Sequence, residues 1–314
     1  MRPLIAVPIT LLLILRSYTR RSLTIPGILT AALTATIHAL HPSALPFTLL
    51  CVFFLLGTTA TKVKHEVKAT LTMSSNGSSG GDGPRTSIQV LANSGCASIL
   101  CAVHVWLYGI GNTAPSWCYG ASKEDHLRDI LLLGIMANYA AVTADTLSSE
   151  LGILSSSQPV LITHPWRVVP RGTNGGVTLA GLLAGVGGSA AIAATSVLFL
   201  SFCVGSTLNG PGTFLLLTAL GTIGTLLDSL LGAMLQASVV DRRTGKIIEG
   251  PGGVKVLVKS RPKPPTQSHE HVRRTNGEES RLVNSGADIL DNNQINLLMA
   301  SIVSLTGMTV GNLL

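Results

Sequence analysis

The sequence predicts an all-α fold: a polytopic integral membrane protein with about eight transmembrane helices, forming a single transmembrane domain over residues 1–314. Of the 314 residues, 46% are hydrophobic and only 12% are charged, whereas soluble domains usually carry roughly 25% charged residues. The mean hydropathy is +0.47. Aromatic residues make up only 4% of the chain, but it contains 33 glycines, and small residues allow transmembrane helices to pack closely.

Eight apolar stretches carry this hydropathy, and each is interpreted as one membrane-spanning helix. The first is followed by Arg16, Arg20 and Arg21, whereas a cleaved signal peptide carries its basic residues before the apolar run. His41-Pro42 separates the second and third stretches as a tight hairpin, because proline ends helices. The predicted spans are residues 4–15, 23–40, 45–59, 88–109, 130–142, 177–204, 213–237 and 295–314.

Two connections are predicted to be long and cytoplasmic. Residues 60–87 contain the segment SSNGSSGGDGP, whose composition is typical of a flexible loop. Residues 239–292 form a longer, basic and largely disordered loop, in which GGVKVLVK (residues 252–259) predicts one short strand.

The distribution of basic residues predicts which side each connection faces. Nineteen of the 22 Lys and Arg residues lie in the four odd-numbered connections between spans, and the even-numbered ones hold only Lys123 and Arg128. Basic residues mark the cytoplasmic side, so the odd connections are predicted to be cytoplasmic and both termini to lie on the other side. This topology accounts for the net charge of +7. We therefore predict the lipid bilayer as partner and no nucleic acid.

The five cysteines show no metal-site spacing. None forms a CxxC pair, and four lie in apolar stretches. We therefore predict that they are buried small hydrophobic residues rather than metal ligands or disulfide partners. They are Cys51, Cys96, Cys101, Cys118 and Cys203.

Polar residues gather at the predicted cytoplasmic ends of the spans. ADTLSSELG (residues 144–152) closes the fifth span with Asp145 and Glu150, and RVVPRGTNGG (residues 167–176) leads into the sixth with Arg171. Glu150 lies about 140° around a helix from Asp145. The two carboxylates could therefore hold one ion only if the helix unwinds at its end, and a capping role is the alternative for Glu150.

Asp228 is the only charged residue inside an apolar run. A carboxylate in the membrane is costly unless it is paired or hydrated, so we predict a functional role for it. The alternative is a structural partner for an Asn or for Arg171. Asn93 in the fourth span and Asn293 in the eighth lie on the same side. Small residues share the helix face of Asp228 within about 60°: Gly221, Thr225 and Gly232.

These residues together suit a site for a metal ion and a phosphate group. Carboxylates hold Mg²⁺, while an arginine and the converging N–H groups of a glycine-rich loop at a helix start hold phosphate. We predict Asp145 and Asp228 as metal ligands, and Asp145, Glu150 and Asp228 as catalytic. The predicted substrate- and phosphate-binding residues are Asn93, Arg171, Gly172, Thr173, Asn174, Gly175, Gly176 and Asn293. A plain turn with an Asn cap is the alternative for GTNGG.

Six sequence blocks resemble, in order, those of the transmembrane protein 19 family: RRSLTIPGILTAAL, GPRTSIQVLANSG, ADTLSSELGILS, RVVPRGTNGGVTLAG, LLDSLLGAMLQ and DNNQINLL. That family includes plastid and cyanobacterial members similar to phytyl-phosphate kinase, which makes a prenyl diphosphate from a monophosphate. The resemblance implies an isoprenoid-phosphate kinase that uses Mg²⁺ and a nucleoside triphosphate, CTP or ATP. It places Asp145, Glu150, Arg171, Asn174, Asp228 and Asn293 at matching motif positions.

Two departures from the family pattern bear on the substrate. A long basic insert precedes DNNQINLL, and no clear plastid transit segment is visible. Both argue against phytyl phosphate itself as the substrate. The predicted location is an endomembrane, the endoplasmic reticulum, rather than a plastid.

Two other classes of function stay open. A transporter or flippase would use the same Asp228 and the glycine-broken helices to move a substrate. It would be expected to show an internal repeat and polar residues through the full membrane depth, and neither is apparent in the sequence. Chemistry at the membrane surface is therefore favoured over transport. A non-catalytic membrane protein is the third alternative.

Overall fold

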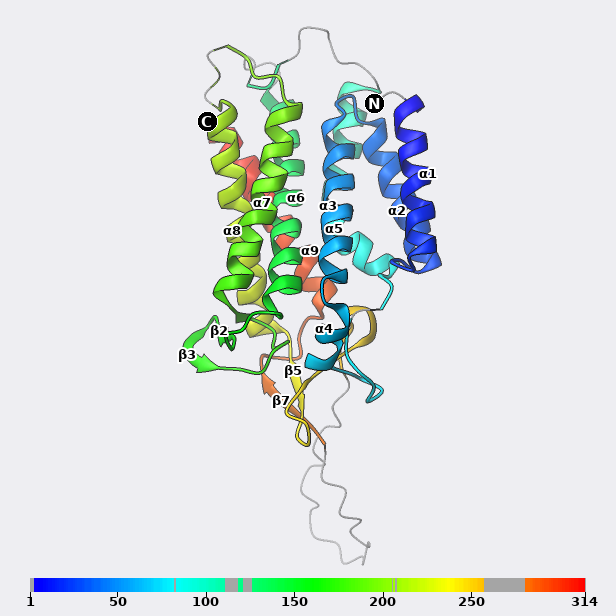
Figure 1. The fold of residues 1–314 in the computed structure, drawn as a ribbon. Helices are drawn as coiled ribbons and strands as arrows, with labels where there is room; N and C mark the ends of the chain where they lie inside the picture. Colours follow the sequence, from blue (N-terminus) through cyan, green and yellow to red (C-terminus); the bar gives the residue numbers. More distant parts are fainter. Residues whose placement is uncertain are drawn as a thin grey trace, which may run out of the picture.

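The protein is a bundle of long helices with two small β-sheets at one end (Figure 1). This computed structural model describes residues 3–81, 83–110, 118–120, 126–204, 206, 208–256 and 280–313. Each predicted span contains one helix: α1 (Pro3–Thr19), α2 (Ile25–Leu40), α3 (Leu45–Lys62), α5 (Ser87–Tyr108), α6 (His126–Gly152), α7 (Leu179–Phe199), α8 (Gly210–Leu235) and α9 (Asn292–Leu313).

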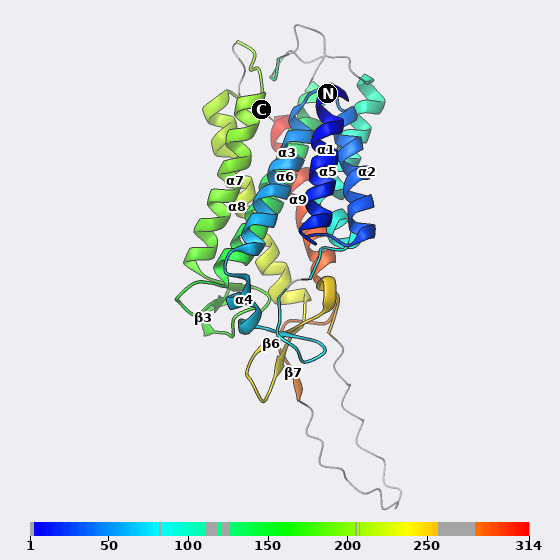
Figure 2. The same cartoon turned by 45° about the vertical axis from the view of Figure 1, so that its right-hand side comes forward.

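Six of these helices are long and apolar enough to cross a membrane: α3, α5, α6, α7, α8 and α9. Helices α1 and α2 are apolar but have only 17 and 16 residues, or about 25 Å at 1.5 Å per residue. They lie on the flank of the bundle away from α7 and α8 (Figures 1 and 2). The helical membrane fold is thus confirmed with six candidate spans, and a total of eight stays a prediction.

Polar caps fix where several helices begin. Thr86 and Gln89 form a reciprocal capping box at the start of α5, and the Thr178 side chain accepts a hydrogen bond from the Gly181 N–H at the start of α7. Helix α6 extends well beyond its predicted span of residues 130–142, because its polar ends are helical too.

Helix α6 is the core of the bundle. It packs against α3, α5, α7, α8 and α9, and every residue from Arg128 to Ala144 is buried. A helix that is buried on all sides must be apolar or small-residue all round, or must satisfy its polar groups internally.

The connections at the lower end of the bundle are folded, which corrects the prediction of an all-α chain. One sheet has the strand order β1-β6-β5-β7. In it β1 (Met73–Ser74) pairs in parallel with β6 (Ile247–Glu249), while β5 (Ser238–Asp241) pairs antiparallel with both β6 and β7 (Arg281–Ser285). The second sheet is formed by β2 (Val160–Leu161), β3 (His164–Val168) and β4 (Gly176–Val177), in the order β3-β2-β4.

Both segments that we expected to be loops contain regular structure. Residues 60–87 include helix α4 (His65–Leu71) and strand β1, and residues 239–292 include β6 and β7. The predicted strand at residues 252–259 is not formed where it is described: Pro251–Gly253 is a short 3-10 helix, and residues 254–256 have no regular structure. Residues 257–279 of the predicted disordered loop lie outside the described residues.

The β5–β6 turn is held by one side chain. Asp241 Oδ2 accepts hydrogen bonds from the Thr244 hydroxyl (2.9 Å) and from its backbone N–H (3.1 Å). The hydroxyl contact is the main reason why the pKa of Asp241 is lower than usual.

A disulfide joins Cys118 and Cys203, which corrects the prediction that all five cysteines are buried hydrophobic residues; Cys51, Cys96 and Cys101 are free. It links the α5–α6 and α7–α8 connections at the end of the bundle away from the sheets (Figure 1). Disulfides persist in oxidising compartments. This end therefore suits the non-cytoplasmic side, in agreement with the distribution of basic residues.

We expect Cys118 and Cys203 to react with a membrane-impermeant maleimide only after reduction, and only from the non-cytoplasmic side. Sealed microsomes and a gel shift with polyethylene-glycol maleimide would measure this. A cysteine introduced by Arg243→Cys, in the exposed β5–β6 turn, should react in sealed microsomes, whose outer face is cytoplasmic, without permeabilisation or reduction, whereas Cys118 and Cys203 should need both. The opposite pattern of labelling would reverse the orientation.

Candidate functional site

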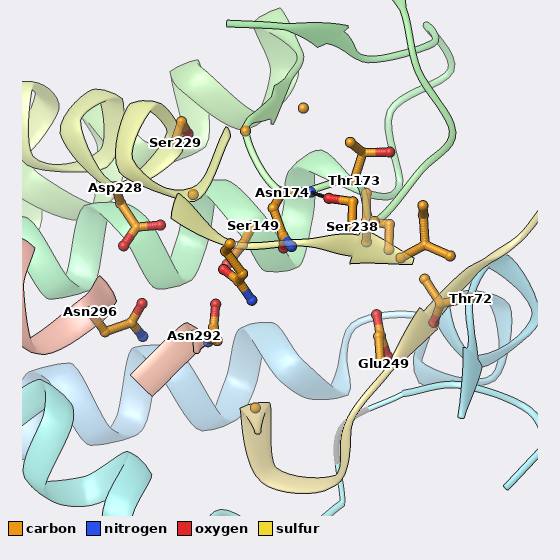
Figure 3. Close-up of a pocket in the computed structure, with 18 of the residues that line it drawn as sticks. Thr72, Ser149, Thr173, Asn174, Asp228, Ser229, Ser238, Glu249, Asn292 and Asn296 are labelled. Carbon is orange, nitrogen blue, oxygen red and sulfur yellow. Dashed lines mark hydrogen bonds between the residues drawn. The ribbon is translucent and has the colours of Figure 1, made fainter. Parts of the chain in front are cut away.

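A cavity of about 370 Å³ lies where the lower ends of the helices meet the sheets. Figure 3 shows part of its lining, with side chains from α8, α9 and the strands directed into it. Ten of the eleven predicted site residues line this cavity: Asn93, Asp145, Glu150, Arg171, Gly172, Thr173, Asn174, Gly175, Gly176 and Asp228. Residues far apart in the sequence are therefore brought together as predicted, although their individual contacts differ.

Asn293 is the predicted site residue that does not line the cavity. It is buried, and its Nδ2 donates a hydrogen bond to the Gly252 carbonyl at 2.9 Å. Its neighbours Asn292 and Asn296 face the cavity instead. Asn293 thus holds the loop after β6 against the start of α9.

Asp145 on α6 and Asp228 on α8 form a pair of half-buried carboxyl groups, close enough to share a hydrogen bond. Thr225 Oγ1 also lies 3.5 Å from Asp145 Oδ1. Among the described residues, no lysine or arginine forms an ion pair with either aspartate. Two like charges this close to each other favour a shared proton or a bound cation.

Asn296 on α9 completes this group. With its amide nitrogen turned toward them, it donates to Asp228 Oδ1 (3.2 Å) and to the Asn292 carbonyl (3.1 Å). In the opposite orientation its amide oxygen would face the same two acceptors, and neither hydrogen bond could form. The side chains of Asp228, Asn292 and Asn296 converge on one space (Figure 3).

Glu150 lies in another part of the cavity wall. Its Oε2 is 2.5 Å from Lys68 Nζ, and its Oε1 accepts a hydrogen bond from Thr61 at 2.7 Å. Lys68 also donates to the Ala60 carbonyl (2.9 Å). Both carboxylate oxygens are thereby engaged in fastening α4 and the end of α3 to α6, so these contacts describe a structural role and not a catalytic one.

Glu150→Gln is expected to lower the free energy of unfolding by about 2 kcal/mol, because the Lys68 ammonium would lose its counter-ion in a mostly buried position. The side chains of this pair are 8% and 15% exposed. The Lys255–Asp288 pair, 37% and 62% exposed, provides the matched control, and Asp288→Asn should cost less than about 1 kcal/mol. Thermal unfolding in detergent measures both, and equal losses would contradict the assignment.

Arg171 lines the cavity, but its guanidinium is used by the chain. Nη1 donates to the Ile153 carbonyl at 2.9 Å and Nη2 lies 3.4 Å from the Ser156 carbonyl. Arg171 therefore fixes the segment that follows α6. The Arg171 guanidinium still places a positive charge at the cavity wall. The geometry supports this part of its predicted role in phosphate binding.

The GTNGG loop is packed tightly against the end of α8. The Asn174 N–H donates to Ser238 Oγ (2.9 Å) and its side chain to the Ala237 carbonyl (3.2 Å). Gly175 has φ +74°, and a Cβ there would lie 2.6 Å from the Ser229 carbonyl and would overlap Ala233. The Gly176 N–H donates to the Thr173 carbonyl (2.8 Å). The glycines thus serve close packing, and three of the N–H groups expected to bind phosphate, those of Thr173, Asn174 and Gly176, are already satisfied.

Several cavity residues were missed by the sequence reasoning. Lys68 and Arg85 add positive charge to the lining, and the loop that begins at Gly250 brings Lys255 to it. Lys255 Nζ donates to the carbonyls of Asp288 (3.0 Å) and Ile289 (2.9 Å). The available signal was the basic residue directly after each glycine-rich segment, GGDGPR and GPGGVK.

Buried polar side chains continue along α6 beyond the cavity, so polar groups are not confined to the predicted cytoplasmic ends of the spans. Asn138 Nδ2 donates to the Asn93 carbonyl (3.0 Å), and Tyr139 Oη lies 2.7 Å from His38 Nε2. Nearer the disulfide, the rings of His41 and His104 lie with their centroids 4.0 Å apart and their planes tilted by 42°. Polar contacts therefore occur through much of the bundle.

Comparisons with known proteins identify the family. The family Integral membrane protein DUF92 matches residues 8–304. Protein PGR of Arabidopsis thaliana is 34% identical over 308 residues, which cover 96% of this chain and 94% of that protein. Protein VTE6, chloroplastic, also of Arabidopsis thaliana, is 29% identical over 210 residues, 67% of this chain and 55% of that protein.

A third relative, an uncharacterized membrane protein of Methanocaldococcus jannaschii, is 44% identical over 106 residues, 33% of this chain and 40% of that protein. No solved structure matches the chain. The family match covers nearly the whole sequence and confirms the resemblance indicated by the six blocks. The chain belongs to the DUF92 family of integral membrane proteins.

Proposed function

We propose that the protein is a magnesium-dependent kinase that transfers a phosphoryl group from a nucleoside triphosphate, CTP or ATP, to a membrane-embedded prenyl monophosphate. The observation that carries the proposal is the carboxyl pair of Asp145 and Asp228 inside a cavity that also contains Lys68, Arg85 and Arg171. The resemblance of the six sequence blocks to a family with phytyl-phosphate kinase-like members supports the same class of reaction.

The residues present fit a magnesium ion. The described residues contain no group of three or more His, Cys, Asp or Glu side chains placed to hold a metal. Mg²⁺ does not need one, because it is usually held by one or two carboxylates together with waters and substrate phosphates. Asp145 and Asp228 would supply the protein ligands, with the Asn296 amide nitrogen donating to Asp228 Oδ1. The ion, when bound, would neutralise charge on the reacting phosphate oxygens.

The chain's own contribution is to position and neutralise two phosphorylated molecules. An oxygen of the prenyl monophosphate attacks the γ-phosphorus, the bond to the β–γ bridging oxygen breaks, and the nucleoside diphosphate leaves. The attacking oxygen is already ionised near neutral pH, so no general base is required. Arg85 and Arg171 place guanidinium groups at the cavity wall, where they would pair with phosphate oxygens; the Lys68 ammonium is already paired with Glu150.

The depth of the carboxyl pair favours a lipid substrate. Asp145 lies seven residues before the end of α6, and Asp228 lies seven residues before the end of α8. This corresponds to about 10 Å from either helix end. A phosphate head group on a prenyl chain within the bilayer can reach this depth from the side, while the nucleotide enters from the cytoplasm.

For localisation we propose an endomembrane, the endoplasmic reticulum. The Cys118–Cys203 disulfide supports a membrane with one oxidising side, a condition that the endoplasmic reticulum meets. The lipid bilayer and the prenyl phosphate are the proposed partners, with no nucleic acid.

The test uses the purified full-length protein in lipid nanodiscs, with γ-labelled CTP or ATP and a panel of prenyl monophosphates of different chain lengths. We expect a labelled prenyl diphosphate that disappears when EDTA removes Mg²⁺. If no combination of nucleotide and acceptor gives a magnesium-dependent diphosphate, the kinase proposal fails.

The buried polar contacts along α6 favour a second candidate, a transporter or flippase for a phosphorylated lipid. Asn138, Tyr139 and His38 extend the polar path beyond the cavity toward the disulfide end. Proteoliposomes would separate the two functions. A flippase would move a fluorescent prenyl phosphate between leaflets without nucleotide, whereas a kinase would leave its distribution unchanged.

A further inference from the structure

Five basic side chains gather beside the cavity, at the ends of α1 and α3. We call Arg16, Arg20, Arg21, Lys62 and Lys64 the basic rim. Arg16 is half-buried and the other four are exposed. The two connections meet at Arg85, whose backbone N–H donates to the Ser22 carbonyl (3.0 Å) and whose Nη2 donates to the Thr61 hydroxyl (3.3 Å). The rim is therefore one surface built from two connections.

None of these five side chains forms an ion pair with a carboxylate of the described chain. The ion pairs and side-chain hydrogen bonds of the described residues include none of the five basic groups. Like charges held together without counter-ions repel one another, and such a patch attracts anions from outside the protein. The occupant must therefore be an anion that the chain does not itself provide.

The backbone gives a second indication. Arg21 (φ +48°) and Lys64 (φ +46°) are the two non-glycine residues with positive φ in the described chain. Glycine adopts this conformation without steric cost, whereas other L-residues do not. Glycine would suit the backbone better at both positions, yet each carries a basic side chain. The positive charge is what that side chain contributes there.

The rim is continuous with the cavity wall. Thr61 and His65, which flank Lys62 and Lys64 in the sequence, both line the cavity. On the other side, the Arg85 N–H donates to the Ser22 carbonyl at 3.0 Å, and Arg85 lines the cavity too. An anion held at the rim is therefore next to the proposed site.

The rim also adjoins an apolar helix surface. Helix α1 presents large apolar side chains such as Leu11, Leu12 and Leu15 to its surroundings. The α1–α2 turn ends short of the lower ends of α6 and α8 (Figure 1). Basic residues directly after a lipid-exposed helix attract the anionic lipids of the cytoplasmic leaflet.

We propose that the basic rim binds the phosphate head groups of anionic lipids in the leaflet that the cavity faces. The occupant is a lipid and not free phosphate, because apolar helix surface adjoins the charges. As a consequence, the rim delivers the phosphorylated acceptor lipid to the cavity. This last step rests on the proposed kinase function, whereas the binding itself does not.

The test compares two double variants of the full-length protein in detergent, with lipid binding measured by native mass spectrometry. Dioleoyl phosphatidic acid is the probe, and dioleoyl phosphatidylcholine is the neutral lipid. Arg21→Gly/Lys64→Gly removes two rim charges and places glycine where φ is positive, so the fold should be kept. Arg242→Gln/Arg243→Gln removes two exposed charges from the β5–β6 turn and is the matched control.

We expect the rim variant to bind phosphatidic acid more weakly, by about fivefold for each charge removed, while the control binds like the wild type. Millimolar inorganic phosphate should not displace the lipid. Unchanged binding by the rim variant, an equal loss in the control, or displacement by phosphate would each overturn the proposal. If the glycine variant unfolds, Arg21→Asn/Lys64→Asn replaces it, since Asn tolerates positive φ.

Activity measurements separate this proposal from the kinase proposal. If the kinase proposal holds, the rim variant should raise KM for the prenyl phosphate and leave kcat nearly unchanged. Loss of lipid binding in the rim variant with no kinase product from the wild type would sustain the rim and reject the kinase. Product formation by the wild type, together with unaltered lipid binding by the rim variant, would sustain the kinase and reject the rim.

Discussion

Asp228→Asn is expected to reduce the rate of prenyl-phosphate phosphorylation by about 10³-fold or more, and to leave the protein folded. The substitution keeps the size of the side chain but removes one of the two carboxyl groups that face each other in the cavity. Because two like charges no longer meet there, the variant should be at least as stable as the wild type without metal.

Magnesium binding gives an independent measurement of the same change. A ligand that binds the folded state raises its stability, so Mg²⁺ should raise the thermal unfolding temperature of the wild type and not that of Asp228→Asn. Asp288→Asn, which alters another carboxylate of the cavity lining, is the control and should keep both the activity and the response. A full Mg²⁺ response in Asp228→Asn would show that this carboxyl group is not a metal ligand.

Gly221→Ala is expected to lower the free energy of unfolding by about 2–3 kcal/mol. Gly221 lies where α8 crosses α6 and α7, and a Cβ there would be 2.8 Å from the Ala140 carbonyl and would overlap Ser189. Neither neighbour is the end of a flexible side chain, so helices must move apart. Thermal unfolding in detergent is the measurement.

The control for this packing prediction lies on the neighbouring helix. A Cβ at Gly187 on α7 would have no atom within 4 Å, and alanine favours a helix more than glycine does by about 1 kcal/mol. Gly187→Ala should therefore be neutral or stabilising. If both alanine variants lose the same stability, close approach of α8 to α6 is not the cause.

The sequence could predict which residues meet but not how each is bonded. Asp145 and Asp228 meet because both lie near the same end of helices that cross the bundle, and basic residues determine that end. Glu150 is paired with Lys68, 82 positions away. Helix periodicity relates only residues within one helix and cannot reveal this pair. A helix cap and a metal ligand were therefore equally good interpretations of Glu150.

The sheets and the disulfide were beyond the reach of sequence patterns for another reason. Strands of two residues, such as Met73–Ser74 and Gly176–Val177, are too short to show alternating hydrophobicity. Cys118 and Cys203 are 85 residues apart, and cysteine spacing does not determine connectivity. Their pairing depends on two loops that come together only after the bundle has formed.

The enclosure of α6 affects how the chain is made. During synthesis α6 reaches the membrane before α7, α8 and α9 exist, although these helices later cover it. Until then Asp145 lacks its partners Thr225 and Asp228 on α8, and an unpaired carboxyl group opposes insertion. We expect chains that stop after α6 to leave this helix poorly inserted, and insertion to recover once α8 has been translated. The most deeply buried helix of the finished protein would then be among the last to be retained by the bilayer.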